Sequence, residues 1–226
     1  MEHLHRLYSR FGTRWIEAFR EPGFVWSTIT GVACFVSAFY VNIFAILFAT
    51  DHASNKVTDL VLSNIPKFDV DGYFVYGTFI FAALCALLIL SEPKRIPFTL
   101  KTLALFWVIR SAFTTLTHIA PDVSSSPDFG PAVNRIFFGA DTFFSGHTGM
   151  PFLGALAFWR YKAIRYAFLV GTVFFGAVVL LGHLHYSIDV AAALFITYGI
   201  FDVAKWLFPR DKRWFYYDLA RARTEE

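Results

Sequence analysis

Two short polar pieces stand within an otherwise apolar chain, and both contain a histidine. The first reads Asp141-Thr-Phe-Phe-Ser145-Gly146-His147-Thr148, and the second reads His185-Tyr186-Ser187-Ile188-Asp189. His185 and Asp189 are four positions apart, so their side chains would share one face of a helix. One histidine held by a carboxylate can attack phosphorus while a second histidine protonates the leaving oxygen. Together these groups could break a phosphoester bond without a metal.

The three side chains of this chemistry have separate predicted roles. We predict that His185 is the nucleophile, that Asp189 accepts a hydrogen bond from one of its ring nitrogens, and that His147 is the acid. Each has a structural alternative, because His185 and Asp189 could pair only with each other at a helix start, and His147 could cap a span. Ionisable groups inside membrane spans are costly and usually functional, which favours the catalytic interpretation.

Four further residues of these pieces are candidates for contact with a substrate. Ser145 and Gly146 could direct backbone N–H groups at phosphate oxygens if a helix starts there, although Gly146 could also serve only close packing. Asp141 could cap that helix, or it could hold the substrate or His147. Tyr186, inside the second piece, is the fourth candidate.

Two arginines are candidate partners for the charge of a phosphate. Arg110 lies about ten residues from the outer end of its predicted span, roughly 15 Å deep. It could contact phosphate there, pair with Asp202, or extend its side chain toward the surface. Arg135 is the alternative cation and lies nearer the surface.

The histidines beside these pieces have less specific surroundings. We predict structural roles for His118 and for His183, which is two positions before His185 and would face another side of a helix. A zinc site built from His147, His183 and His185 is an alternative. The predicted mechanism needs neither a metal nor another cofactor.

The composition is typical of a helical membrane protein. The chain has 226 residues, of which 56% are hydrophobic and only 16% charged, whereas soluble domains carry roughly 25% charged residues. We therefore predict an all-α, polytopic membrane protein with one helical bundle. The pI near 8.9 does not indicate nucleic-acid binding, because the basic residues lie at the ends of apolar stretches and do not form one patch.

Six apolar stretches are long enough to cross a bilayer, which takes about 20 residues. The predicted transmembrane helices are Phe24–Ala49, Gly72–Leu90, Ile96–Ala120, about Asp141–Trp159, Ala163–Leu181 and His185–Phe208. In this scheme His147 lies about two turns, roughly 9 Å, inside the fourth helix.

The distribution of Lys and Arg predicts the orientation of these helices. Most of the 20 Lys and Arg residues fall on one side of the six-span scheme, which the positive-inside rule places in the cytoplasm. Residues 1–23, predicted as an amphipathic interfacial helix, and residues 209–226, predicted as a basic tail, would both be cytoplasmic. Residues 24–208 would form the transmembrane catalytic domain, with both histidine pieces at its periplasmic, lumenal or extracellular face.

The two pieces resemble those of the phosphatidic acid phosphatase type 2 (PAP2) superfamily, and within it those of the sphingomyelin synthase branch. That branch carries Asp-x-x-x-Ser-Gly-His-Thr, matched by residues 141–148, and His-Tyr-[Ser/Thr]-[Ile/Val]-Asp-Val, matched by residues 185–190. A third block, an Arg followed by threonines and then Pro, is matched loosely from Arg110 to Pro121. The resemblance implies a core of six membrane helices.

The chain departs from the phosphatase branch at two cationic blocks. A Lys-x6-Arg-Pro block is not matched, because eight residues separate Lys101 from Arg110 and no Pro follows Arg110. Val178 and Val179 stand where a Ser-Arg pair would precede the second histidine. A phosphomonoester dianion needs such charge, whereas a lipid phosphodiester has one negative charge and needs less. These departures favour transfer of a diester headgroup over hydrolysis of a monoester.

The resemblance implies a membrane lipid phosphotransferase. Such an enzyme would move a phospho-headgroup from a glycerophospholipid donor to a lipid alcohol, ceramide-like or diacylglycerol, through a phosphohistidine. The alternative within the superfamily is a lipid phosphate phosphatase or a phospholipase C-type hydrolase, with water as the acceptor. The alternative outside it is a non-catalytic lipid-binding membrane protein. The expected partners are lipids of the bilayer, and nucleic acid is not among them.

Overall fold

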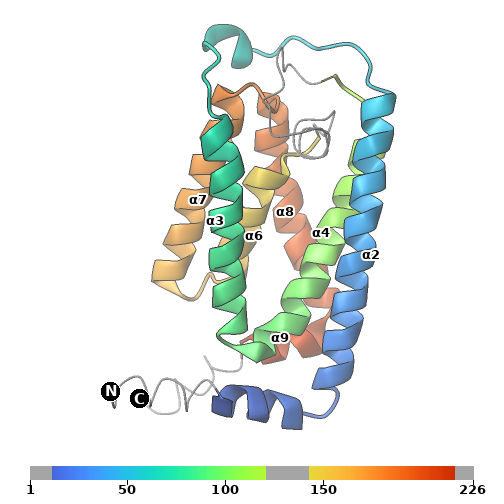
Figure 1. Cartoon of the computed structure of the whole chain (residues 1–226), viewed down its shortest axis with the longest axis vertical. Coiled ribbons are helices and arrows are strands. Elements are labelled where there is room, and N and C mark those ends of the chain that lie inside the picture. The colour runs from blue at the N-terminus through green and yellow to red at the C-terminus, as the bar shows by residue number, and fades with distance from the viewer. Residues whose placement is uncertain (1–11, 121–142, 217–226) are drawn as a thin grey trace.

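The chain folds into a helical bundle. The computed structural model describes residues 12–120 and 143–216, and no strand occurs within them. The long helices of this part are α2 (Phe24–Asp51), α3 (Asp71–Leu90), α4 (Ile96–Leu116), α6 (Gly146–Ala157), α7 (Lys162–Leu181) and α8 (Ser187–Leu207). Shorter helices are η1 (Leu62–Asn64), η2 (Pro93–Arg95), α9 (Pro209–Phe215) and residues 12–20. The predicted all-α class is confirmed (Figure 1).

Five of these helices are long and apolar enough to cross a membrane. They are α2, α3, α7, α8 and the continuous helix Pro93–Leu116, which joins η2 to α4. The fourth predicted span is the exception, because α6 has only 12 residues, about 18 Å at 1.5 Å per residue against the roughly 30 Å of a hydrocarbon core. The predicted order of helices is confirmed, but the prediction of six full-length spans is not.

The two ends of α6 are well defined in the structure. Ser145 is its N-cap, with a non-helical backbone and a side-chain oxygen that accepts a hydrogen bond from the N–H of Thr148. The predicted start near Asp141 is not observed, and Asp141 itself lies outside the described residues. At the other end the chain leaves the helix at Phe158 and turns into α7.

Helix α6 occupies the interior of the bundle. It packs against α7 and α8, while α2 packs along α4, as Figure 1 shows. Two glycines of α6 allow close approach, because a Cβ atom at Gly149 would lie 2.9 Å from the ring of Phe106, and one at Gly154 would lie 2.4 Å from the ring of Phe168. Aromatic rings therefore fill the space that side chains on α6 would otherwise occupy.

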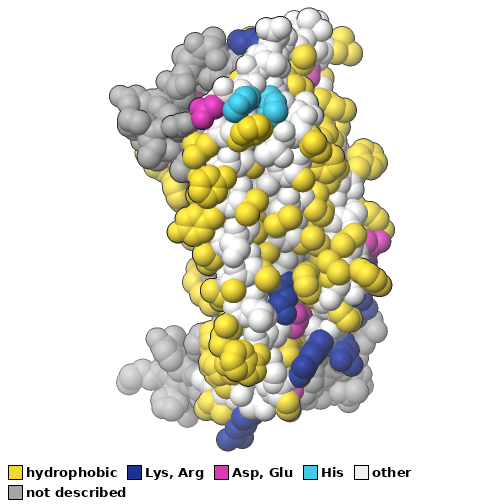
Figure 2. Space-filling view, turned by 90° about the vertical axis from the view of Figure 1, so that its right-hand side faces the viewer, with side chains coloured by type: hydrophobic (Ala, Val, Ile, Leu, Met, Phe, Trp, Pro, Cys, Tyr) yellow, Lys and Arg dark blue, Asp and Glu magenta, His cyan; other side chains and the backbone are white. Residues whose placement is uncertain are grey.

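The outer surface of the bundle is apolar. Side chains such as Phe44 (69% exposed), Val173 (73%) and Phe195 (80%) point away from the core. Figure 2 shows hydrophobic side chains covering the middle of the face over α2, with Lys and Arg gathered toward its lower end. This distribution is expected of a protein whose helices face lipid, since soluble domains rarely expose so large an apolar area. A multi-pass membrane protein is therefore the class that the structure fits.

Ion pairs join the helices at the basic end of the bundle. Lys101 Nζ lies 2.6 Å from Asp211 Oδ2 and donates to Ser27 Oγ at 2.6 Å. Lys94 Nζ lies 3.2 Å from Glu21 Oε1, which ties the N-terminal segment to η2. Residues 12–20 form a helix across this end (Figure 1). Residues 1–11 lie outside the described part, and the interfacial position of residues 1–23 stays a prediction.

The region predicted as a basic tail is partly built into the bundle. Residues 209–215 form α9, in which Trp214 and Phe215 are buried. The ring of Phe215 lies 5.5 Å from the ring of Phe98 in α4. Only residues 217–226 remain of the predicted tail, and they lie outside the described residues.

The packing of α6 predicts that Gly154→Ala will destabilise the protein. The new Cβ would meet the ring of Phe168 at 2.4 Å, and overpacking a core typically costs about 1–3 kcal/mol. Gly199→Ala in α8 is the matched control, because nothing lies within 4 Å of its Cβ position. Thermal unfolding in detergent, followed by circular dichroism, should show a lower Tm for Gly154→Ala and an unchanged or higher Tm for Gly199→Ala. Equal Tm values for the two variants would contradict this packing.

Candidate active site

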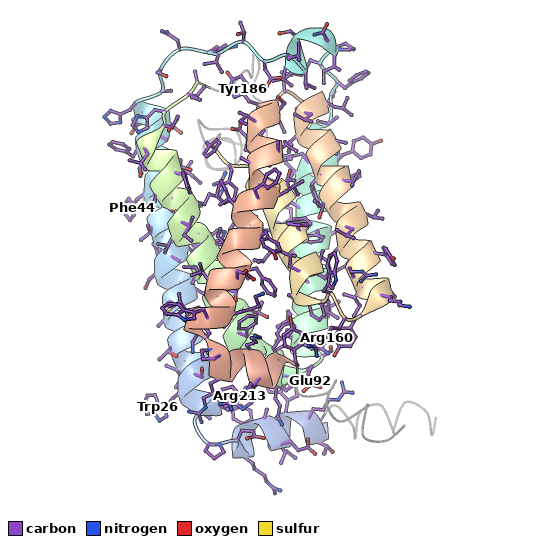
Figure 3. All side chains as sticks on the ribbon, turned by 180° about the vertical axis from the view of Figure 1, so that it is seen from behind. Trp26, Phe44, Glu92, Arg160, Tyr186 and Arg213 are labelled. Atoms are coloured by element: carbon purple, nitrogen blue, oxygen red, sulfur yellow. The ribbon has the colours of Figure 1, made fainter. Side chains whose placement is uncertain are left out.

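The two polar pieces of the sequence meet at the end of the bundle opposite the basic end. Figure 3 places Tyr186 at one end of the molecule and Glu92, Arg160 and Arg213 at the other. The starts of α6 and α8 are joined directly, because the backbone N–H of Ser145 donates to the backbone C=O of Asp189 at 3.2 Å. Residues that are distant in the sequence therefore form one site.

His185 and Asp189 form a buried pair. His185 Nδ1 lies 3.5 Å from Asp189 Oδ2, and the two side chains are 6% and 1% exposed. The predicted pairing is present, but its origin differs from the prediction, because α8 begins at Ser187 and not at His185. Asp189 therefore lies in the first turn of α8, while His185 lies just before that helix.

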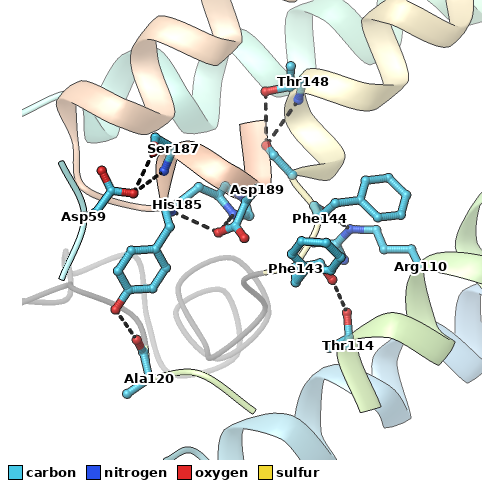
Figure 4. A network of polar contacts seen from close by, with 12 residues as sticks. Asp59, Arg110, Thr114, Ala120, Phe143, Phe144, Thr148, His185, Ser187 and Asp189 are labelled. Atoms are coloured by element: carbon cyan, nitrogen blue, oxygen red, sulfur yellow. Dashed lines mark hydrogen bonds and ion pairs between the residues drawn. The ribbon is translucent and has the colours of Figure 1, made fainter. Parts of the chain in front are cut away.

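The carboxylate of Asp189 also fixes the backbone beside the histidine. Its Oδ2 accepts a hydrogen bond from the N–H of Tyr186 at 2.9 Å. Its Oδ1 is buried and has no hydrogen-bond partner among the described residues. One carboxylate oxygen thus holds both the ring of His185 and the chain that follows it (Figure 4).

His147 lies in the first turn of α6, as the second residue of that helix. The predicted depth of two turns is therefore wrong, because the helix starts at Gly146 and not near Asp141. Its ring packs against Phe74 of α3, with centroids 4.3 Å apart, and near Phe175 of α7 at 6.2 Å. The hydrogen bond from Ser145 to Asp189 joins the start of its helix to the first turn of α8. The structure therefore brings His147 into the neighbourhood of the His185–Asp189 pair.

Ser145 and Gly146 shape the start of α6. The Oγ of Ser145 accepts hydrogen bonds from the N–H and the hydroxyl of Thr148, at 3.4 and 3.2 Å. A Cβ atom at Gly146 would lie 3.2 Å from Nε of Arg110. The absence of a side chain at Gly146 therefore lets the arginine lie against the first turn of the helix.

Arg110 is buried and supports the backbone that precedes α6. It is 4% exposed, and its Nε donates to the C=O of Phe144 at 2.8 Å. The suggested pair with Asp202 is not observed, because Asp202 is exposed and pairs with Lys205. The predicted depth was too great, since α4 ends at Leu116 and not at Ala120.

Thr114, one turn after Arg110 on α4, supports the neighbouring peptide. Its Oγ1 donates to the C=O of Phe143 at 3.1 Å. Three consecutive residues before α6 are thus held from outside their own segment: Phe143 by Thr114, Phe144 by Arg110, and Ser145 by Asp189. Figure 4 shows the bond from Thr114 to Phe143, with Arg110 beside Phe144.

The remaining candidates are Tyr186, Asp141, Arg135 and the alternative zinc site. The hydroxyl of Tyr186 donates to the C=O of Ala120 at 2.8 Å and accepts from the N–H of Val57 at 3.4 Å, so it is engaged within the protein. Asp141 and Arg135 lie outside the described residues. Within the described ranges, no three His, Cys, Asp or Glu side chains are grouped as a metal site would require.

One acidic residue of this site was missed by the sequence analysis. Asp59, from the segment between α2 and α3, accepts two hydrogen bonds from Ser187 at the start of α8. No spacing rule links positions so far apart, and Asp59 stands in a polar loop where a solvated carboxylate is expected.

Comparison with known proteins matches part of the chain to a family. Residues 139–207 match a family described as PAP2 superfamily C-terminal. The match supports the PAP2 superfamily. It covers α6, α7 and α8 and includes His147, His185 and Asp189. No curated protein and no solved structure matches the chain. The match is in line with a phosphatase or phosphotransferase acting on lipids, whereas the sphingomyelin synthase branch is not shown.

The contacts of α4 predict that Thr114→Val will destabilise the site. The valine removes the donor to Phe143 and leaves a carbonyl without its partner, which should cost about 1 kcal/mol. Thr115→Val is the matched control, because among the described residues the hydroxyl of Thr115 bonds to carbonyls of its own helix, those of Ser111 and Ala112. Tm measurements in detergent should show a clear decrease for Thr114→Val and little change for Thr115→Val. A larger decrease in Tm for Thr115→Val than for Thr114→Val would contradict this prediction.

Proposed function

We propose that the protein is a membrane lipid phosphotransferase that moves a phospho-headgroup from a glycerophospholipid to a lipid alcohol. The observation that carries this proposal is the buried pair of His185 and Asp189, joined through the Ser145–Asp189 hydrogen bond to the helix that carries His147. A histidine whose Nδ1 faces a carboxylate presents its other ring nitrogen, Nε2, as a nucleophile.

In the proposed first step, Nε2 of His185 attacks the phosphorus of the donor diester. The bond between phosphorus and the glycerol oxygen breaks, and His147 gives its proton to the departing alkoxide, so that diacylglycerol leaves. The headgroup phosphate remains bound to His185. Asp189 stabilises the positive charge that develops on the imidazole, as the carboxylate of a catalytic triad does. The distance of 3.5 Å between the two side chains is expected to shorten in the reacting complex.

In the second step, His147 is neutral and takes the proton of an acceptor hydroxyl. The hydroxyl oxygen attacks phosphorus, the bond from phosphorus to His185 breaks, and the headgroup is transferred. The acceptor is a ceramide-like alcohol or diacylglycerol, in line with the resemblance to the sphingomyelin synthase branch. The proton ends on His147, so the enzyme returns to its starting state.

The charge around the site suits a phosphodiester. Arg110 lies against Gly146 at the start of α6, where the first N–H groups of a helix have no partner within the helix and favour an anion. One buried guanidinium with a helix N-terminus matches the single negative charge of a diester. This balance supports headgroup transfer over hydrolysis of a monoester dianion.

The proposed orientation places this site away from the cytoplasm. Of the described residues, Lys94, Lys101, Arg160 and Arg213 belong to the basic end, and Figure 3 shows Arg160 and Arg213 far from Tyr186. Positive charge favours the cytoplasmic side of a membrane, so both termini would be cytoplasmic. The donor and acceptor lipids would then come from the outer, periplasmic or lumenal leaflet.

The proposal predicts the products of purified protein in mixed micelles. With a labelled glycerophospholipid and a ceramide-like alcohol, mass spectrometry should detect diacylglycerol together with the alcohol that has gained the headgroup. His185→Ala and Asp189→Asn should lower this transfer by about a thousandfold or more, because the nucleophile and its orienting carboxylate act as a unit.

His183→Asn is the matched control for these variants. His183 is close in sequence and has a positive φ of 54°, which asparagine tolerates, so transfer should persist at close to the wild-type rate. If free phosphate or a free headgroup phosphate is released and nothing is transferred to the alcohol, the protein is a hydrolase of the same superfamily and not a transferase. Turnover that is unchanged in both His185→Ala and Asp189→Asn would refute the enzymatic proposal.

A further inference from the structure

The segment between α2 and α3 crosses the end of the bundle that holds the candidate site. It comprises residues 52–70, includes η1, and lies over the end where α7 and α8 are connected (Figure 1). The N–H of Phe68 donates to the C=O of Leu181 at 2.9 Å, which anchors the segment beside α7. This segment is therefore in contact with the elements that carry the site.

Asp59 is the residue through which this segment reaches α8. Its Oδ2 accepts hydrogen bonds from the N–H of Ser187 at 2.7 Å and from the hydroxyl of Ser187 at 2.8 Å (Figure 4). Its Oδ1 accepts from the N–H groups of Val61 and Leu62 at 2.8 and 3.0 Å. One carboxylate thus satisfies the start of η1 and the start of α8 together.

The charge of Asp59 suits this position. Burial alone would raise its pKa, but hydrogen bonds from Leu62, Ser187 and Val61 outweigh that effect and lower the pKa below its ordinary value. The side chain is therefore a carboxylate at neutral pH. A negative charge at a helix N-terminus is stabilising, because the first N–H groups of the helix are unpaired and the helix dipole is positive there.

The start of α8 and the end of α7 together position the nucleophile. His185 lies two residues before Ser187 and outside α8, and its own N–H donates to the C=O of Val179 in α7 at 3.4 Å. Asp189 holds the peptide between them through the N–H of Tyr186. Asp59 holds Ser187 from the opposite side, outside the bundle.

We propose that Asp59 is a positioning residue, which fixes the first turn of α8 from the α2–α3 segment and thereby directs the ring of His185 at the reacting phosphorus. The inference rests on the proposed function of His185 as the nucleophile. Asp59 itself touches neither the substrate nor the reacting atoms. Its role is to keep the nucleophile within the narrow range of geometry that efficient attack requires, since a displacement of about 1 Å can cost a factor of about 100 in rate.

The test compares Asp59→Asn with Asp69→Asn in the full-length protein in detergent. Asparagine keeps the size of the side chain but loses the charge that makes its hydrogen bonds to Ser187 strong. Asp69 is the matched control, because it belongs to the same segment and accepts from the N–H of Asp71 at the start of α3, away from α8. For Asp59→Asn, kcat should fall by about 10- to 100-fold with KM nearly unchanged, at a temperature where both variants are folded. For Asp69→Asn, both constants should match the wild type.

A spectroscopic measurement keeps the inference testable if the wild type shows no turnover. Imidazole 15N signals of labelled protein, with the signal of His185 assigned through its loss in His185→Gln, should shift in Asp59→Asn and stay in place in Asp69→Asn. A shift without any wild-type transfer activity would reject the proposed function and retain the positioning role. An unchanged His185 signal, or an unchanged kcat in an active enzyme, would overturn the role of Asp59.

Discussion

The hydrogen bond from the N–H of Ser145 to the C=O of Asp189 is the contact on which the rest of the site depends. It joins the cap of α6 to the first turn of α8, so each helix start is positioned by the other. His147 follows the donor by two residues, and His185 precedes the acceptor by four. A shift of either helix along its axis would break this bond and would separate the two histidines. The glycines of α6 support the same arrangement, because they let Phe106 and Phe168 pack closely against a short helix and hold it in place.

A second constraint comes from the membrane. Irregular backbone is tolerated at membrane depth only where its polar groups are satisfied within the protein. The residues before α6 meet this condition one by one, since the carbonyls of Phe143 and Phe144 accept from Thr114 and Arg110, and Ser145 donates to Asp189. Arg110 therefore has two functions in the proposed enzyme. Its Nε donates to the C=O of Phe144 the hydrogen bond that water would otherwise supply. Its charge lies at the start of α6, where the phosphate of the proposed substrate would bind. Substitution of Arg110 would alter both, so a loss of activity there would not by itself identify a phosphate contact.

The sequence predicted the helical class, the order of the helices and the pairing of His185 with Asp189, because each follows from local pattern or short spacing. It did not predict that α6 starts at Gly146 and has 12 residues. Phe143 and Phe144 continue the apolar run, so hydrophobicity alone does not show that they precede the helix. Nor did it predict the partner of Arg110. The interaction of Asp59 with Ser187 joins positions in different parts of the fold, and neither residue type nor spacing marks it. Contacts of this kind are decided by tertiary packing, which hydrophobic periodicity does not encode. Asp141 and Arg135, both predicted from sequence, lie outside the described residues and stay predictions.

In the proposed enzyme, His147 and His185 act on one phosphorus atom. The most direct measurement is an experimental structure of the protein with orthovanadate, which mimics the five-coordinate phosphorus of the transition state. If both histidines act on one phosphorus, vanadium will be bonded to Nε2 of His185, with His147 within about 3 Å of the apical oxygen on the opposite side. Vanadate bound away from His185, or the two imidazoles too far apart to reach the same vanadium, would contradict it.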